Sequence, residues 1–326
     1  MEGYLNKQIK RIGILTSGGD ASGMNAAIRA AVRYAAYKKI EVYGFYEGFK
    51  GLIANNFKVL TNNSVGGIID RGGTFLYTAR SEAFKAKEGL LKAKKNLEED
   101  LIDALIIIGG EGSFRGARDL NELGVNVVGV PATIDNDIYG TDFSLGFDTA
   151  LNVIISLISK IRDTASSHER IFVIEVMGRN SGELAIKSGL ACGADYILIP
   201  EIKTDLVKIS NSIKHHREGK RHTLIIVAEG SAKAEDVASS IKLLVEHEVR
   251  VSVLGHIQRG GSPSALDRIL AAQFARKAVD FLIEGGTNAM VAVSNNQIKV
   301  LNFNEVLGKS RPINEQLYKF AHILAL

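Results

Sequence analysis

The chain has 326 residues, of which 46% are hydrophobic and 23% charged, with a formal net charge of +4 and no tryptophan. This is the composition of an ordinary globular protein with one large or two medium domains. Because the excess positive charge is small and no basic block is interleaved with aromatic residues, we exclude nucleic acid as a partner and keep anionic small molecules as candidate ligands.

Nine short β-branched runs, most of which end in Gly, Ser, Thr or Asp, are predicted strands, and helical patterns follow at 25–39 and 149–163. Strands that are apolar throughout and alternate with amphipathic helices indicate an α/β fold with parallel sheets covered on both faces. The charged segment 85–100 is predicted to be a solvated helix face. The strand-like runs span 11–19, 41–48, 103–110, 125–133, 170–178, 196–201, 222–230, 250–258 and 290–296.

The first run leads into TSGGDASGMNAA, residues 16–27, where Gly18 and Gly19 leave backbone N–H groups bare just before a predicted helix. One interpretation is a cradle for a phosphate group. The other is a tight strand-to-helix turn, and this stretch alone does not choose between them. No GK[ST] follows, so the segment is not a Walker loop.

The run IIIGGEGSFRGA, residues 106–117, has the same arrangement with one carboxylate, Glu111, inside the glycine-rich turn. Its spacing does not fit G-x-G-x-x-G, so a dinucleotide site is weakly supported. In one interpretation the turn amides hold a polyphosphate and Glu111 holds a bridging magnesium ion. In the other, Glu111 is a first-turn helix residue stabilised by the helix dipole.

Two carboxylates follow the fourth predicted strand in PATIDNDIYGTD, residues 131–142. If the strand stays extended, Thr133, Asp135 and Asp137 share one face, with the carboxylates about 6 to 7 Å apart. One could then bind metal while the other accepts a proton. Alternatively, both are ordinary turn or cap residues.

Cationic side chains follow two later strands, in EVMGRNSGE (175–183) and SVLGHIQRGGSP (252–263). Together, Arg179, Arg250, His256 and Arg259 would make a receptor for a phosphate ester, because guanidinium groups match phosphate oxygens. A histidine at a strand end can also be purely structural.

The single cysteine, Cys192, excludes an intramolecular disulfide and a cysteine-based zinc site, and it favours a reducing compartment. No apolar run has the length of a signal h-region or a membrane span. We therefore expect a cytoplasmic protein with no membrane partner.

Taken together, six segments resemble the ATP-dependent 6-phosphofructokinases of bacteria, in the family's order from Arg11 to about Lys309. They are TSGGDASGMNAAIRAAVR, RGGTFLYTAR, IIIGGEGS, PATIDNDIYGTD, RIFVIEVMGRNSG and VLGHIQRGGSPSALDRILA. The resemblance implies phosphoryl transfer from ATP to the 1-hydroxyl of fructose 6-phosphate. It also implies two Rossmann-like three-layer lobes with mostly parallel sheets.

In the picture that the resemblance implies, Asp135 is the general base, with Thr133 beside it and Asp137 as a second catalytic carboxylate. Arg179 would stabilise charge on the moving phosphoryl group. Two of the implied substrate-binding residues, Arg170 and Arg250, would come from a neighbouring subunit. The implied substrate-binding residues are Arg170, Met177, Gly178, Glu229, Arg250, His256 and Arg259.

The resemblance also implies a nucleotide site, which would hold Mg²⁺, or Mn²⁺ as the alternative, through Glu111 and Asp137. Pyrophosphate-dependent relatives carry Asp and Lys where this chain has Gly112 and Ala132, so we expect ATP as the donor, with Gly116 leaving room for adenosine. The implied ATP-binding residues are Gly19, Arg80, Ser81, Gly110, Glu111, Gly112, Ser113 and Gly116.

Two of the chain's departures from the family bear on its activity and regulation. The family's usual Asp in the second glycine turn is Glu111 here, one methylene longer, so we expect an active enzyme with altered metal dependence. In the effector pocket, Asn62, Gly67 and Glu218 replace two basic groups and an acid, which predicts weak activation by ADP. The retained effector residues are Arg29, Arg33, Arg162, Asp195, Lys220 and Arg221.

The resemblance predicts an ATP-binding lobe of 1–146 plus 258–308 and a fructose 6-phosphate-binding lobe of 147–257 plus 309–326. It predicts a homotetramer whose active sites lie between lobes and are shared between subunits. Two other functions stay open: a non-catalytic regulatory paralogue that binds sugar phosphate or nucleotide, and a pyrophosphate-dependent or other sugar-phosphate kinase.

Overall fold

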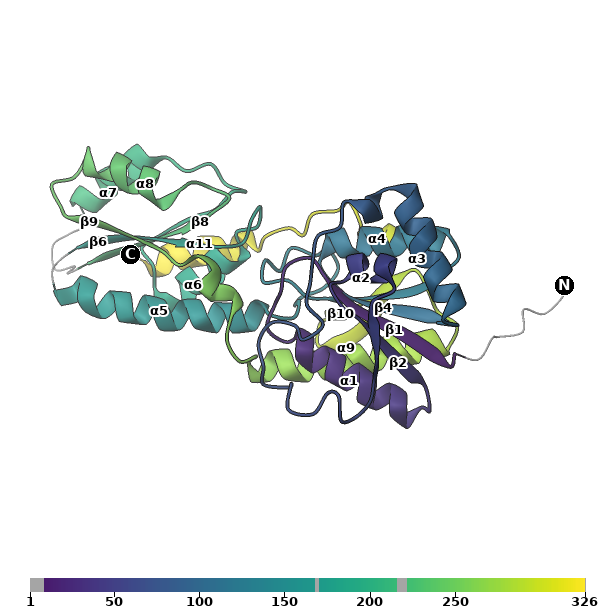
Figure 1. Cartoon of the computed structure of the whole chain (residues 1–326). Helices are drawn as coiled ribbons and strands as arrows, with labels where there is room; N and C mark the ends of the chain where they lie inside the picture. Colours follow the sequence, from purple (N-terminus) through teal and green to yellow (C-terminus); the bar gives the residue numbers. More distant parts are fainter. Residues whose placement is uncertain (1–8, 168–169, 216–221, 326) are drawn as a thin grey trace. The chain divides into compact units, whose positions relative to one another are not determined.

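The computed structural model describes residues 9–167, 170–215 and 222–325. The chain forms two compact units, each assembled from three separate stretches of sequence (Figure 1). The first unit takes Met1–Thr133, Ile138–Thr149 and Arg259–Ser310, and the second takes Ile134–Asp137, Ala150–Gln258 and Arg311–Leu326.

The first unit is built on a seven-stranded sheet in the order β11-β10-β5-β4-β1-β2-β3. Its five inner strands are parallel, and both edge strands are antiparallel to their neighbours. The strands are β1 (Arg11–Ser17), β2 (Glu41–Phe45), β3 (Phe57–Leu60), β4 (Ala104–Gly109), β5 (Asn126–Pro131), β10 (Ala289–Ser294) and β11 (Gln297–Asn302).

The inner strands confirm the sequence prediction of an α/β fold, because each coincides with an apolar run. β3 and β11 were not predicted. Each pairs with one neighbour only and keeps exposed or half-exposed side chains along most of its length. Neither edge strand therefore carries the continuous apolar run by which the inner strands were recognised.

Helices cover both faces of this sheet. In Figure 1, α1 (Met24–Tyr37) and α9 (Ala265–Ile283) pack side by side on one face, and α2 (Phe49–Ala54), α3 (Lys87–Glu99) and α4 (Glu111–Glu122) lie on the other. Phe45 and Phe114 are fully buried in the core beneath the second face. A 3-10 turn at Ala83–Lys85 and the short α10 (Phe303–Val306) complete the unit.

The order of the strands reverses between β1 and β4. β1 leads through α1 to β2 on one side, whereas β4 leads through α4 to β5 on the other. In open α/β sheets, ligands bind outside the carboxyl ends of the strands at this reversal. Ser17 and Gly109, the last residues of the two strands, are paired in register, so both glycine-rich turns begin at that point.

The second unit is a four-stranded, all-parallel sheet in the order β7-β8-β6-β9. Figure 1 shows α5 (Phe147–Ser167) and α6 (Glu183–Cys192) on one face and α7 (Leu206–His215) and α8 (Ala234–Lys242) on the other. The C-terminal helix α11 (Glu315–Leu324) packs on α6. The strands are β6 (Ile171–Val176), β7 (Tyr196–Leu198), β8 (Thr223–Ala228) and β9 (Val249–Val253).

Within the part of the chain that the structure describes, no helix combines the length and the hydropathy that a bilayer crossing requires.

Candidate active site

The two glycine-rich turns of the first unit meet at the strand reversal. Gly18 has φ +89° and Gly23, the N-cap of α1, has φ +108°, backbone conformations that L side chains rarely adopt. A Cβ on Gly109 would lie 2.4 Å from the carbonyl oxygen of Ser17, so only glycine allows the two turns to approach this closely. The geometry leaves bare backbone at a position suited to an anion.

Glu111 is the first residue of α4, with Gly110 as its N-cap. Its Oε1 accepts hydrogen bonds from Arg115 Nη2 at 2.8 Å and from the backbone N–H of Gly308 at 3.1 Å. A Cβ on Gly112 would meet no atom within 4 Å, so the turn is open there. Ser113, one residue later, is buried. The Glu111 carboxylate thus stabilises the start of α4, as the second interpretation predicted. Any metal binding by Glu111 would come in addition to this.

The free space expected at Gly116 is filled. A Cβ at this position would lie 2.9 Å from the ring of Phe84 and 3.1 Å from that of Phe49, and these two rings stack with centroids 4.0 Å apart. Ser81 accepts a hydrogen bond from Phe84 N–H and so starts the 3-10 turn, and Arg80 beside it is exposed. Gly116 is needed here for packing against these rings.

Arg259 lies at the first glycine turn of its own unit. Its Nη1 is 3.5 Å from Oδ1 of Asp20, and a Cβ on Gly19 would overlap the same guanidinium group. The side chain of Arg259 is 17% exposed, and its Nε is buried without a hydrogen-bond partner in the described structure. Gly19 therefore makes room for a largely buried cation next to the turn.

The segment after β5 is not the extended strand end that the sequence predicted. β5 ends at Pro131, and Asn136 has φ +49°, in the left-handed region. This turn separates the two carboxylates, because Asp135 is buried, only 4% exposed, whereas Asp137 is exposed. Just before the turn, the carbonyl of Thr133 accepts a hydrogen bond from Ser144 Oγ at 2.7 Å.

In the second unit, the end of β6 and the end of β8 bring charged groups to Asp135. Nε of Arg179 lies 3.7 Å from Oδ2 of Asp135. Arg179 has φ +51° and follows Gly178 at φ +133°, and its backbone N–H donates to Oε1 of Glu229 at 2.9 Å. The sequence predicted all four residues, and the structure brings them together.

Gln258 is a buried contributor that the sequence reasoning missed. Its Oε1 accepts from the backbone N–H of Met177 at 3.1 Å, and its Nε2 donates to the carbonyl of Gly255 at 2.9 Å. It thereby ties the loop after β6 to the loop after β9, where His256 is exposed. The signal available in the sequence was its place between two predicted ligands, His256 and Arg259.

Arg170 and Arg250 do not join this group. Arg170 directly precedes β6, and Arg250 is the second residue of β9, so both lie at the amino edge of the sheet. Arg179 follows the carboxyl end of β6, six strand residues or about 20 Å further along. The four-cation receptor predicted from the residues is therefore wrong within one subunit. Arg250 belongs to the start of its strand, not to the loop after it.

Glu248 occupies the space between these two arginines. Its Oε2 accepts from Nε of Arg170 at 2.5 Å, and its Oε1 contacts Nη2 of Arg250. The hydrogen bond from Arg170 lowers the pKa of Glu248 below its ordinary value, and the charge of Arg250 acts in the same direction. Sequence reasoning did not consider this acid, because its pairing depends on β6 lying beside β9.

The predicted effector residues lie on several elements. Arg29 and Arg33 are on α1, and Arg162 is on α5. Asp195 is buried and accepts a hydrogen bond from the backbone N–H of Leu224 at 2.7 Å, which joins the starts of β7 and β8. The last two predicted residues, Lys220 and Arg221, lie outside the described residues.

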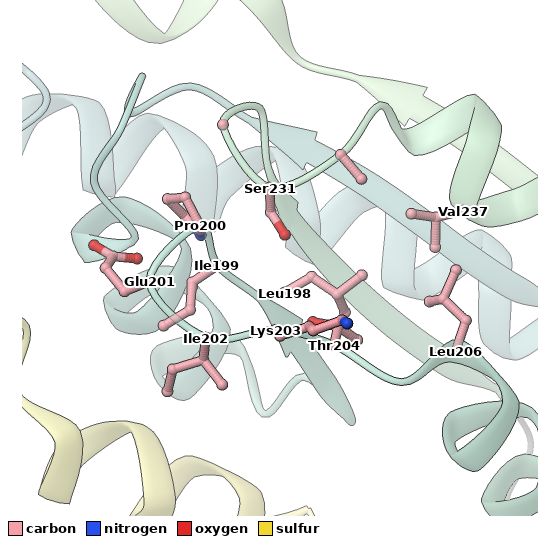
Figure 2. A pocket seen from close by; sticks show the side chains of 12 residues that line it. Leu198, Ile199, Pro200, Glu201, Ile202, Lys203, Thr204, Leu206, Ser231 and Val237 are labelled. Atoms are coloured by element: carbon pink, nitrogen blue, oxygen red, sulfur yellow. The ribbon is translucent and has the colours of Figure 1, made fainter.

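A hollow of about 550 Å³ lies at the carboxyl edge of the second sheet, between the loops after β7 and β8 (Figure 2). Its polar lining includes Glu201, Lys203 and Ser231. Glu201 Oε1 also accepts from the backbone N–H of Gly182 at 2.8 Å, which joins the β7–α7 loop to the start of α6. None of the predicted site residues lines this hollow.

Known proteins resemble this chain along nearly its whole length. The phosphofructokinase family model matches residues 11–282. The ATP-dependent 6-phosphofructokinases of Brevibacillus brevis and Halalkalibacterium halodurans are 50% and 52% identical over 319 residues, which cover 98% of this chain and 100% of each relative.

Solved structures agree with the fold. The phosphofructokinase of Saccharomyces cerevisiae is 36% identical with a TM-score of 0.85, and the match covers 91% of this chain and 45% of the longer yeast chain. A pyrophosphate-dependent phosphofructokinase from Marinobacter aquaeolei reaches the same TM-score at 23% identity, which supports the fold alone.

Proposed function

The chain belongs to the phosphofructokinase family, and from that premise we propose that it transfers the γ-phosphoryl group of ATP to the 1-hydroxyl of fructose 6-phosphate. The products are fructose 1,6-bisphosphate and ADP, in the glycolytic direction. The observation that carries the proposal is the buried carboxylate of Asp135 with the guanidinium of Arg179 3.7 Å away. We place the reaction in the cytoplasm, where glycolysis takes place.

Asp135 and Arg179 have complementary tasks in such a reaction. The Asp135 carboxylate accepts the proton of the attacking hydroxyl, and Arg179 stabilises negative charge on the transferred phosphoryl oxygens. Phosphoryl transfer needs little covalent assistance from the protein, because positioning and charge neutralisation supply most of the rate enhancement. Glu229 accepts from the N–H of Arg179 and so holds that loop. In the proposed site its carboxylate would contact the sugar hydroxyls.

The sugar phosphate site is proposed to need two subunits. Met177, Gly178, Glu229 and His256 follow carboxyl ends of strands, while Arg170 and Arg250 lie at the amino edge, about 20 Å away. A neighbouring copy can supply the two arginines where one subunit cannot. This supports a homo-oligomer, and we propose a tetramer.

ATP is proposed to bind at the strand reversal of the first unit, with its phosphates over the two glycine turns. Gly19, Gly110, Gly112 and Ser113 lie there. Gly112 leaves open space where pyrophosphate-dependent relatives carry Asp, which supports ATP as the donor. In this assignment the first unit is the nucleotide lobe and the second is the sugar lobe. Arg80 and Ser81 flank the site, and Gly116 contributes through the packing of Phe49 and Phe84.

A divalent cation is part of this proposal, and the donor chemistry fits magnesium. Glu111 and Asp137 offer carboxylate oxygens, which are the ligands that this hard cation prefers. Among the described residues no cluster of three or more His, Cys, Asp or Glu is arranged for a metal, so nucleotide oxygens would complete the shell. When bound, the ion would neutralise charge on the phosphate oxygens. Manganese is the alternative ion.

The extra methylene of Glu111 is expected to alter metal dependence. Oε1 of Glu111 is committed to Arg115 and Gly308, so metal binding must use the other oxygen or displace these bonds. We expect Glu111→Asp to lower the magnesium concentration for half-maximal rate several-fold, measured by titrating Mg²⁺ and Mn²⁺ at fixed ATP. Arg115→Met, which removes one of these two hydrogen bonds and leaves the glutamate side chain unchanged, is the paired variant. Superimposable metal titrations of wild type and Glu111→Asp would contradict the prediction.

Glu248 is expected to compete with the sugar phosphate for Arg170 and Arg250. Glu248→Gln removes the competing charge, so the half-saturating concentration of fructose 6-phosphate should fall, with kcat unchanged. Because exposed ion pairs are weak, the change should be small, no more than about fivefold. Steady-state kinetics measure it, with Glu246→Gln as a charge-matched control. A rise in half-saturation would show instead that Glu248 aligns the arginines.

The proposed function is tested by assaying the purified protein for fructose 1,6-bisphosphate with coupled enzymes. ATP and pyrophosphate are compared as donors, and other sugar phosphates as acceptors. Turnover with ATP and fructose 6-phosphate is expected. Turnover with pyrophosphate but not with ATP would contradict the assignment of ATP as the donor. Binding of both substrates without product would indicate a non-catalytic paralogue.

A further inference from the structure

A buried chain of contacts leads from helix α6 to the turn that carries Asp135. Glu183, the first residue of α6, is 4% exposed. Its Oε2 lies 3.8 Å from Nη2 of Arg311 and 3.2 Å from Nζ of Lys187. Nη1 of Arg311 donates a hydrogen bond to the carbonyl oxygen of Asn136 at 3.1 Å. All of these residues belong to the second unit.

The position of Asn136 gives this contact its importance. Asn136 is fully buried, stands between Asp135 and Asp137, and has φ +49°. A non-glycine residue in this left-handed region is held there by its surroundings. Arg311 supplies part of that restraint, because its guanidinium bonds the carbonyl at the centre of the turn.

Arg311 is itself held in place. Its side chain is only 18% exposed, and the carboxylate of Glu183 faces one arm of the guanidinium while the other arm reaches Asn136. The segment that follows Arg311 is tethered by α11, which packs on α6, and by Tyr318, whose hydroxyl donates to the carbonyl of Ile197 at 3.2 Å. A planar, two-armed cation suits this bridge, whereas an ammonium group has no fixed fork.

We propose that Arg311 is a positioning residue for the phosphoryl-transfer reaction, and that the buried Glu183 orients it. We call the contacts from Glu183 through Arg311 to the carbonyl of Asn136 the clamp. The clamp holds the Asn136 turn so that the Asp135 carboxylate stays directed at Arg179. This inference rests on the proposed function, because it assigns Asp135 the role of the base. It adds the C-terminal segment to the parts of the chain on which turnover depends.

Four variants test the clamp by steady-state kinetics: Arg311→Met, Arg311→Lys, Glu183→Gln and the double variant Arg311→Met/Glu183→Gln. A displacement of about 1 Å in a catalytic group costs about 10²-fold in rate. We therefore expect Arg311→Met to lower kcat about 10- to 100-fold, with KM for both substrates within about twofold of wild type. Arg311→Lys should recover part of the loss. The double variant should be no slower than Arg311→Met, because Glu183 acts through Arg311.

Arg11→Met is the matched control. Arg11 also links a carboxylate, Glu41 at 2.9 Å, to a main-chain carbonyl, that of Asp100 at 3.0 Å, but at the amino end of β1. Its loss should leave kcat unchanged. A kcat of Arg311→Met within twofold of wild type would contradict the proposal. So would a double variant whose fold-loss in kcat equals the product of the losses in Arg311→Met and Glu183→Gln. If Arg311→Met does not fold, a kcat of Arg311→Lys equal to wild type overturns it.

Hydrogen exchange separates failure of the clamp from failure of the proposed function. Peptides that cover 134–138 should exchange faster in Arg311→Met than in wild type or Arg11→Met. If wild type shows no kinase activity, the proposed function fails, and faster exchange in Arg311→Met still supports the clamp. Equal exchange in all three proteins overturns it.

Discussion

Replacement of Asp135 by serine is expected to lower kcat by about 10²- to 10⁴-fold, the usual contribution of a general base. The carboxylate is 4% exposed and has Nε of Arg179 as a close cation, so no bulk water replaces it as a proton acceptor in the same place. KM for fructose 6-phosphate should stay within a few-fold, because the proposed sugar contacts belong to other residues. Steady-state kinetics with ATP and fructose 6-phosphate measure both constants.

Asp205→Ser is a matched control for that variant. Oδ1 of Asp205 accepts from the N–H of Lys208 at 3.1 Å and caps the start of α7 in the same unit. Serine caps helices as well as aspartate does, so stability and kcat should both be retained. Near-wild-type kcat in Asp135→Ser would remove Asp135 from the reaction. A large rise in KM with unchanged kcat would make it a binding residue instead.

Replacement of Asp267 by alanine is expected to lower the free energy of unfolding by about 3 kcal/mol. Asp267 is 1% exposed, and its two oxygens accept hydrogen bonds from Gly146 N–H and Thr149 N–H, each at 2.9 Å, and from Thr149 Oγ1. It therefore satisfies donors at the start of α5 from the first turn of α9. Alanine would leave these buried donors unpaired, and each hydrogen bond to a charged group contributes about 1.5 to 3 kcal/mol.

The measurement is reversible urea unfolding, with Glu235→Ala as the control. Glu235 is an exposed acid in the first turn of α8, where its loss should change stability by less than about 0.5 kcal/mol. Equal midpoints for Asp267→Ala and Glu235→Ala would show that the start of α5 does not depend on Asp267.

The stability difference between wild type and Asp267→Ala is also expected to depend on pH. Burial raises the pKa of Asp267 above the ordinary value for an aspartate, although the hydrogen bonds from Thr149 and Gly146 act in the opposite direction. Between the unfolded and the folded pKa, the folded state holds the proton more tightly, so this group's contribution to stability falls as pH rises through that window. The stability difference between wild type and Asp267→Ala should therefore shrink as pH rises from about 4.

Much of the site could be predicted because the chemistry is concentrated at strand ends. The glycine turns after β1 and β4, the pair Asp135 and Arg179, and Glu229 all directly follow apolar runs. Within each of the two sheets, parallel strands bring their carboxyl ends to one edge. The backbone conformation within the turns was harder to predict from the sequence. The left-handed Asn136 separates two carboxylates that strict alternation would place on one face, and the rings of Phe49 and Phe84 fill the space that Gly116 leaves.

The amino-acid sequence by itself determined the α/β class, the inner strands and the family, because apolar periodicity and glycine spacing are local properties of the chain. Only the tertiary structure decided the edge strands β3 and β11, the pairing of Glu248 with Arg170 and Arg250, and the bridge from Glu183 through Arg311 to Asn136. The side chains in contact in these two clusters are 78 or more residues apart, except for Glu248 and Arg250, and neighbouring strands and packed helices bring them together. A buried charge must find a partner wherever the fold supplies one.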